Sequence, residues 1–106
     1  MKTGIEFIAE ERQRQIEAKG YDGRHDAKHK VTELIDAAMA YVQAASTDYM
    51  NETDGLHPEL LEQHYDSIKR FTWRWGDETF KPTTCLKDLI KAGALIAATI
   101  DRLQND

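Results

Sequence analysis

The fold is decided by residues 28–46, KHKVTELIDAAMAYVQAAS, in which apolar side chains recur every three or four positions. That spacing is the period of an α-helix with one buried face, and a β-strand would split the same residues between two faces. Asp26 stands just before the segment and can cap its first turn. The apolar residues expected to face the core are Val31, Leu34, Ile35, Ala38, Tyr41, Val42 and Ala45.

Three further segments have helical spacing and start signals of their own. Thr3 and Glu6 have the spacing of a capping box, and Pro58 suits the first turn of a helix. Thr83 or Thr84 can cap the last segment. No segment alternates with a period of two, so the sequence predicts an all-α bundle of about four helices. The expected helices cover about 4–19, 28–46, 58–71 and 85–103.

Length and composition are those of one globular domain over residues 1–106. Hydrophobic residues make up 41% of the chain and charged residues 31%, a balance that disfavours a disordered chain. The longest apolar run, residues 92–100, is too short to span a bilayer, and no secretory signal is visible. Cys85, the single cysteine, cannot form an intrachain disulfide. We therefore expect a cytoplasmic protein without a membrane partner.

The charges are unevenly distributed along the chain. Residues 31–66 contain eight acidic residues and no lysine or arginine, whereas both flanks are slightly basic. Duplex nucleic acid needs a basic face, so it is not an expected partner. The acidic stretch would suit a metal, a charge-complementary self-contact or simply a solvated surface.

The second and last predicted helices carry small or apolar residues on two faces. On the last helix the face expected to point inward consists of Leu86, Leu89, Ile90, Gly93, Ile96, Ala97, Ile100 and Leu103. The opposite faces contain Ala40 on the second helix and Leu95 on the last. A chain of this length gains stability by self-association, so we expect a homodimer or homotetramer through these opposite faces.

Arg12 is predicted near the centre of the apolar stripe of the first helix, with Lys19 close by. A guanidinium aimed at a core needs an anion, which can be Asp36 or Asp88 of this chain or a phosphate of a ligand. Arg14 leaves the same helix about 200° away from Arg12. The geometry of an isolated helix thus makes Arg12, and not Arg14, the expected anion-holding residue.

A second group of candidates lies at the start of the second predicted helix. His29, Glu33 and Asp36 share one helical face, and His25 precedes them in a loop. Carboxylate oxygens on adjacent turns can hold Mg²⁺, although such spacings are also common on solvated helices.

Residues 71–82 contain both tryptophans of the chain, Trp73 and Trp75, together with Arg74 and Lys81. Aromatic rings beside cations are suited to a base and its phosphates. The alternative is that the tryptophans close one end of a small bundle.

Taken in order, these segments resemble the small proteins common in phages and prophages. The motifs that carry the resemblance are Glu11 to Gln15, Gly20-Tyr21, His25-Asp26, Glu33-Leu34, Ala37-Ala38, Tyr41, Trp73-Arg74-Trp75, Lys81-Pro82, Asp88-Leu89, Lys91 to Leu95 and Asp101 to Leu103. Some members of that group are distantly similar to the MazG-like all-α nucleotide pyrophosphohydrolases.

The resemblance implies an oligomeric helical bundle that handles a phosphorylated nucleotide. MazG-like enzymes bind Mg²⁺ through acidic clusters on two neighbouring helices, and here only Glu33-x-x-Asp36 resembles such a cluster, with Asp88 as a third candidate ligand. Arg74 replaces the usual proline between the tryptophans, and Thr99 replaces a glutamate often found in the last helix.

Three functions are compatible with these patterns. The favoured one is binding of a nucleotide or nucleotide-derived signal without turnover, as in a phage protein that sequesters a host defence signal. The expected ligand-binding residues are Arg12, Gln15, Lys19, His25, Trp73, Trp75, Lys81, Lys91 and Arg102. The second is a Mg²⁺-dependent nucleoside triphosphate pyrophosphohydrolase with Glu33, Asp36 and Asp88 at the metal. The third is a helical protein–protein adaptor.

Overall fold

The computed structural model describes residues 1–19 and 30–105, and in this part of the chain it is helical without strands. The predicted all-α class with four helices is therefore confirmed. The elements are α1 (Gly4–Lys19), α3 (Val31–Thr53), α4 (Pro58–Phe71), the 3₁₀ turn η1 (Asp77–Thr79) and α5 (Cys85–Asn105). None of the described helices is both long enough and apolar enough to cross a membrane.

Local signals explain where the helices begin. Thr3 and Glu6 form the expected capping box, since each accepts a hydrogen bond from the backbone N–H of the other at 3.3 Å. At α5 the cap is Thr84, whose hydroxyl oxygen accepts a hydrogen bond from the N–H of Lys87 at 3.2 Å. Before Pro58, the imidazole of His57 caps α4 by accepting from a backbone N–H of the first turn.

The end of α3 differs from the prediction. The helix continues to Thr53 instead of ending near position 46, and the expected residues 28 and 29 lie outside the described part. The additional turns are stabilised by tertiary contacts, because Asp48 is buried and accepts a hydrogen bond from the hydroxyl of Tyr65 on α4. Gly55 then ends the helix with a φ of 78°, and its N–H bonds back to two carbonyls of the last turn.

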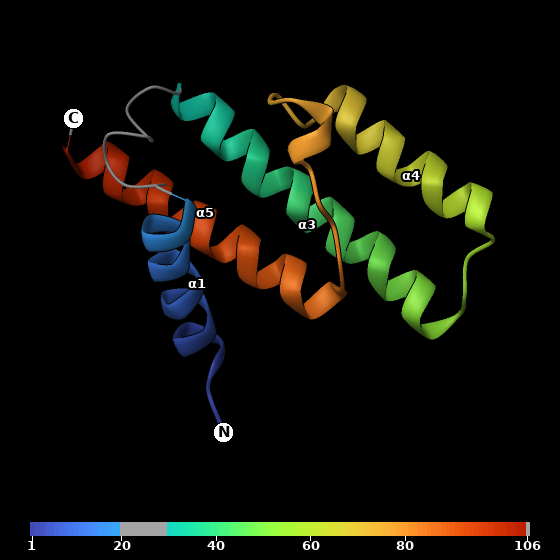
Figure 1. Ribbon diagram of the computed structural model, residues 1–106, viewed down its shortest axis with the longest axis horizontal. Helices are drawn as coiled ribbons and strands as arrows, with labels where there is room; N and C mark the ends of the chain where they lie inside the picture. Colours follow the sequence, from blue (N-terminus) through green and yellow to red (C-terminus); the bar gives the residue numbers. More distant parts are fainter. Residues whose placement is uncertain (20–29, 106) are drawn as a thin grey trace.

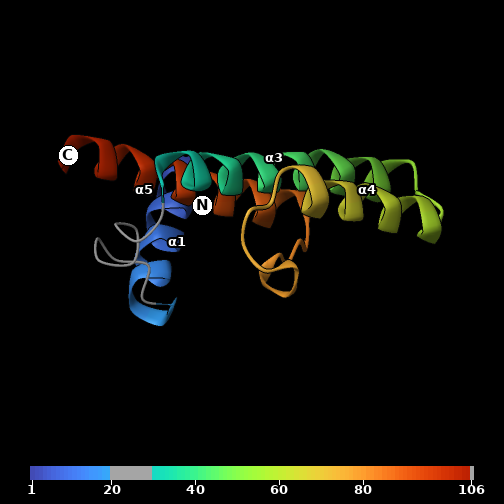
Figure 2. The ribbon, with the colours of Figure 1, turned by 90° about the horizontal axis from the view of Figure 1, so that it is seen from above.

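Three helices form a single layer. α5 runs antiparallel along one side of α3, and α4 lies along the other side (Figure 1). α1 crosses α5, and it lies with the loop between α4 and α5 on the same side of the layer (Figure 2). The crossing is close because Gly93 has no side chain: a Cβ there would stand 2.5 Å from Cδ1 of Ile8.

The core lies between α3, α5 and the α4–α5 loop, and it reverses the predicted faces of α5. Leu95 and Ala98 are buried in it, as is Ala40 of α3. Five of the eight expected inward residues are instead exposed to between 47% and 61%: Leu86, Leu89, Ile96, Ile100 and Leu103. Ile35 and Val42 of α3 are exposed as well.

The prediction of the buried face of α5 was wrong because alanine-rich faces let α3 and α5 approach closely. Periodicity alone does not tell which of two apolar faces is inside. Ala40 and Leu95, which were expected at the contact between copies, are thus buried within a single chain.

Candidate functional site

A small pocket of about 30 Å³, the tryptophan pocket, lies where α1, α3, α5 and the α4–α5 loop meet. Its walls combine aromatic, cationic and amide side chains: Glu11, Arg14, Gln15, Tyr41, Trp73, Trp75, Thr79, Lys91 and Leu95. Glu11, Arg14 and Lys91 also line a groove of about 500 Å³ between α1 and α5, the α1–α5 groove. The pocket and the groove thus share one charged wall.

The part of that wall contributed by α1 is a hydrogen-bonded cluster. Nε and Nη2 of Arg14 each donate to Glu11 at 2.7 Å, and Nε2 of Gln15 donates to Glu11 at 3.2 Å. Partial burial raises the pKa of Glu11, but the hydrogen bond and positive charge of Arg14 outweigh it and hold this pKa below 4.5. Glu11 is therefore ionised at neutral pH and fixes both neighbours.

Gln15 is the most informative member of the cluster. It is 4% exposed, and its buried Oε1 accepts no hydrogen bond from any residue that the structure describes. Because Glu11 occupies the amino end of the amide, Oε1 is the end that is left to accept. A buried acceptor without a donor costs about 1–3 kcal/mol. An N–H or O–H group in the pocket would remove that cost.

The two tryptophans have different roles. Trp73 is buried, contacts Tyr41 and Phe80 with ring centroids 5.6 and 5.1 Å away, and donates its indole N–H to Gly76 O at 3.1 Å. It belongs to the hydrophobic core. Trp75 is partly exposed, lines the pocket and packs against Trp73 in an edge-to-face arrangement with ring centroids 5.2 Å apart.

Lys91 of α5 supplies the cation nearest to the aromatic cluster. Its Nζ donates to Lys81 O at 2.9 Å, lies 5.1 Å from the centre of the Tyr41 ring and is 3.8 Å from Asp88 Oδ1. The expected site residue Lys81 thus contributes its backbone, whose N–H also donates to the Tyr41 hydroxyl. The loop and α5 are joined at the pocket by these bonds.

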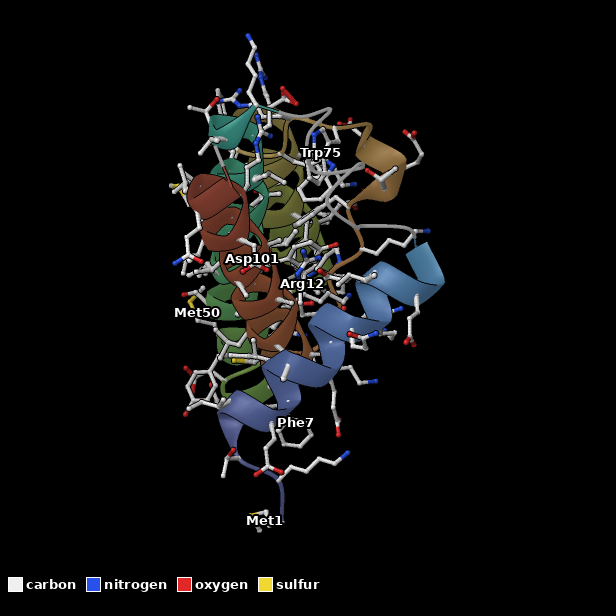
Figure 3. All side chains as sticks on the ribbon, turned by 90° about the vertical axis from the view of Figure 1, so that its left-hand side faces the viewer. Met1, Phe7, Arg12, Met50, Trp75 and Asp101 are labelled. Atoms are coloured by element: carbon white, nitrogen blue, oxygen red, sulfur yellow. The ribbon has the colours of Figure 1, made fainter. Side chains whose placement is uncertain are left out.

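Arg12, the expected anion-holding residue, lies elsewhere. Its Nη2 is 3.8 Å from Asp101 Oδ2 on α5, where the two labelled side chains approach in Figure 3. Arg12 lines neither the pocket nor the groove, and neither does Arg102; Arg14 lines both. The helix crossing decides this, because α1 meets α5 on Arg12's side and leaves Arg14 facing the loop. The side chain of Lys19, as well as His25, lies outside the described part of the chain.

The expected metal ligands are not brought together. Oε1 of Glu33 accepts a hydrogen bond from the indole N–H of Trp75 at 3.3 Å, and Asp36 pairs with Arg74 at 3.0 Å. Asp88 lies against the second half of α3 instead. Within residues 1–19 and 30–105, no three histidine, cysteine or acidic side chains are placed to hold a metal together.

Asp88 belongs to a buried carboxyl pair that the sequence did not reveal. It is fully buried and accepts from the N–H of Thr83 at 3.1 Å with both oxygens. Burial, and then the contact with Asp48, raise the pKa of Asp88 to about 7. Asp48 was missed because the predicted helix ended before it. The pair joins α5 to α3, and through Tyr65 to α4.

No protein-family model, curated protein or solved structure matches this chain. The chemistry of the tryptophan pocket and the α1–α5 groove is therefore the main guide to function.

Proposed function

We propose that the protein binds a nucleotide-type small molecule in the tryptophan pocket and the α1–α5 groove. The observation that carries this proposal is the buried Oε1 of Gln15, which has no donor among residues 1–19 and 30–105 although Gln15 lines the same small space as Trp75, Arg14 and Lys91. The pocket has room for little more than a single polar group, whereas the groove is within the size range of small-molecule sites.

The residue types fit the parts of a nucleotide. The Gln15 carbonyl can accept from an amino or hydroxyl group, and the ring of Trp75 offers a face for a base. Arg14 and Lys91, with Lys87 in the groove, are suited to phosphate oxygens. Glu10 and Glu11 lie on the same wall and partly offset these cations, which favours a ligand of modest charge.

The charged wall of the tryptophan pocket supports binding of the nucleotide without its hydrolysis. The carboxylate at the pocket, Glu11, is held by two hydrogen bonds from Arg14 and one from Gln15. Such a carboxylate orients its neighbours and is poorly available as a base. In a phage-infected cell, a protein of this kind would sequester a host signalling nucleotide. We also propose that it acts as an oligomer held through α3 and α5.

The decisive experiment is to denature the purified protein and identify the released small molecules by mass spectrometry. We expect an intact nucleotide, and we expect that nucleotide to raise the melting temperature of ligand-free protein. The variants Gln15→Leu and Trp75→Ala should lose this response, whereas Arg70→Ala on α4, which lines neither the pocket nor the groove, should keep it.

Two results would contradict the proposal. One is protein that releases no small molecule and gains no stability from a panel of mono- and dinucleotides. The other is cleavage of nucleoside triphosphates in Mg²⁺, which would assign the protein to the pyrophosphohydrolase alternative.

A further inference from the structure

The layer of α3, α4 and α5 is covered on one side only in the described part of the chain. α1 and the α4–α5 loop lie on one side, and no described element lies on the other (Figure 2). Met50 of α3 projects from that uncovered side, away from α1 and Trp75 (Figure 3). Helical domains normally bury an apolar face against a second layer. The uncovered side of the layer therefore has no packing partner among the described residues.

This uncovered side is apolar along both of its central helices. Seven aliphatic side chains of α3 and α5 are exposed to between 42% and 56%: Ile35, Met39, Val42, Leu89, Ile96, Ile100 and Leu103. Five of them line one hollow, and helical spacing places Leu89 and Leu103 on the same side of α5. Between the two helices lies a shallow hollow of about 330 Å³ whose lining contains no charged side chain. We call this surface the α3–α5 face.

The spacing of these residues is that of helices which pack against other helices. Ile35, Met39 and Val42 are separated by four and then three positions, and Ile96, Ile100 and Leu103 repeat the same intervals. Alternating intervals of four and three produce the apolar stripe of coiled coils and four-helix bundles. Two such stripes on neighbouring antiparallel helices are half of a four-helix bundle.

We propose that the α3–α5 face is covered by the same face of a second copy of this chain, so that α3 and α5 of both protomers form a four-helix bundle. Seven half-exposed aliphatic side chains present on the order of 600 Å² of apolar surface. That area is close to the ~800 Å² that each partner buries in a standard interface. An apolar patch of that size is at the upper end of what monomers expose, and such patches often mark interaction sites.

The chemistry of the face selects a copy of the chain over a charged partner. A two-fold contact places the same patch of both copies together, so a patch that carries no charges is complementary to itself. The hollow has no charged lining and meets this condition, although the chain carries a net charge of −5. The contact lies on the opposite side of the layer from the tryptophan pocket, so it stands whether or not the pocket binds a nucleotide.

Sedimentation equilibrium of the full chain tests the proposal. We expect a species of twice the 12.2 kDa chain mass at micromolar concentration. The double variant Met39→Glu, Ile96→Glu should raise the dimer dissociation constant at least 100-fold while the helical circular dichroism stays unchanged. Leu86→Glu is the matched control: it adds a charge at a residue that is 61% exposed on the α1 side of α5, and it should remain dimeric.

A cross-linking arm covers the case in which the charged variants unfold. In a Cys85→Ser background, Met39→Cys should give covalent dimers with a short bismaleimide, and Leu86→Cys should not. Three results would overturn the proposal. They are a wild-type mass of 12.2 kDa at every concentration, a wild-type mass above that of a dimer, and dissociation by Leu86→Glu but not by the double variant.

Discussion

At the scale of single residues, Arg12 and Arg14 show how two arginines on one helix acquire different roles. Arg12 is mostly buried and lies beside Asp101, whereas Arg14 is held by Glu11 at the rim of the tryptophan pocket. The first arrangement joins α1 to α5, and the second holds a guanidinium in the wall of the tryptophan pocket. Their substitution should therefore affect different properties of the protein.

We expect Arg14→Ala to weaken binding of the co-purifying nucleotide by about 1.5–3 kcal/mol, the range for a hydrogen bond to a charged group. Arg12→Ala should leave that affinity nearly unchanged and lower the free energy of unfolding by about 1 kcal/mol, because it removes buried aliphatic stem as well as charge. Isothermal titration and urea denaturation of both variants measure the two effects. Equal affinity losses would mean that the site extends to Arg12.

Asp88 gives a pH-dependent stability whose sign follows from its raised pKa. In the unfolded chain its carboxyl loses a proton near pH 3.8, whereas in the folded protein the pKa is about 7. Between these values the folded state binds more protons than the unfolded state, so stability falls as the pH rises. The contribution of Asp88 is complete below the lower value and is lost as the pH passes the upper one.

Urea denaturation should accordingly show a free energy of unfolding about 1–3 kcal/mol higher near pH 5 than near pH 8, attributable to Asp88. Asp88→Asn, which cannot titrate, should flatten this dependence; Asp77→Asn in η1 is the matched control and should retain it. An equally steep dependence in Asp88→Asn would show that another group is responsible.

At the scale of elements, helix starts were predictable and the end of α3 was not. Thr3, Pro58 and Thr84 mark starts through local bonds that a short stretch of sequence contains. The last turns of α3 depend on Asp48 and its bond to Tyr65, a contact seventeen positions away that local patterns do not reveal. The buried face of α5 was missed for a similar reason, since both of its faces are apolar.

The candidate site was predictable in part. Gln15, Trp73, Trp75 and Lys91 were expected to contribute and do line one pocket. Arg14 was not predicted to line the pocket. The geometry of one helix fixes the angle between two side chains, but it does not determine which of them meets a neighbouring loop. The short motif from Glu11 to Gln15 was the available signal.

Gly55 should be difficult to replace, because its positive φ is what ends α3. We expect Gly55→Ala to lower the free energy of unfolding by about 1 kcal/mol, although a Cβ there would meet no atom within 4 Å. Gly4→Ala is the control: a Cβ there also meets nothing within 4 Å, and its φ is not positive. Thermal unfolding should find it neutral or slightly stabilising; a similar loss in both variants would contradict the role of φ.

At the scale of the whole molecule, one layer carries two surfaces of different chemistry on its two sides. The side with α1 and the loop holds the tryptophan pocket, and the uncovered side holds the α3–α5 face. If the second copy supplies the missing layer, folding and association are linked.

The melting temperature of the wild-type protein should then rise with protein concentration, by a few degrees for each tenfold increase. The Met39→Glu, Ile96→Glu variant should melt at a lower temperature that does not change with concentration. Differential scanning calorimetry over a hundredfold concentration range provides the comparison, and a constant wild-type melting temperature would contradict the linkage.

The edge-to-face contact between Trp73 and Trp75 also has a consequence for the intrinsic tryptophan fluorescence of the protein. These are the two tryptophans of the chain, their ring centroids are 5.2 Å apart, and one of them lines the pocket. Indoles at this separation exchange excitation energy, so all of the tryptophan emission originates within one cluster. Light emitted by the unlabelled protein therefore registers a molecule entering beside Trp75, while events on the α3–α5 face leave its colour and intensity nearly constant.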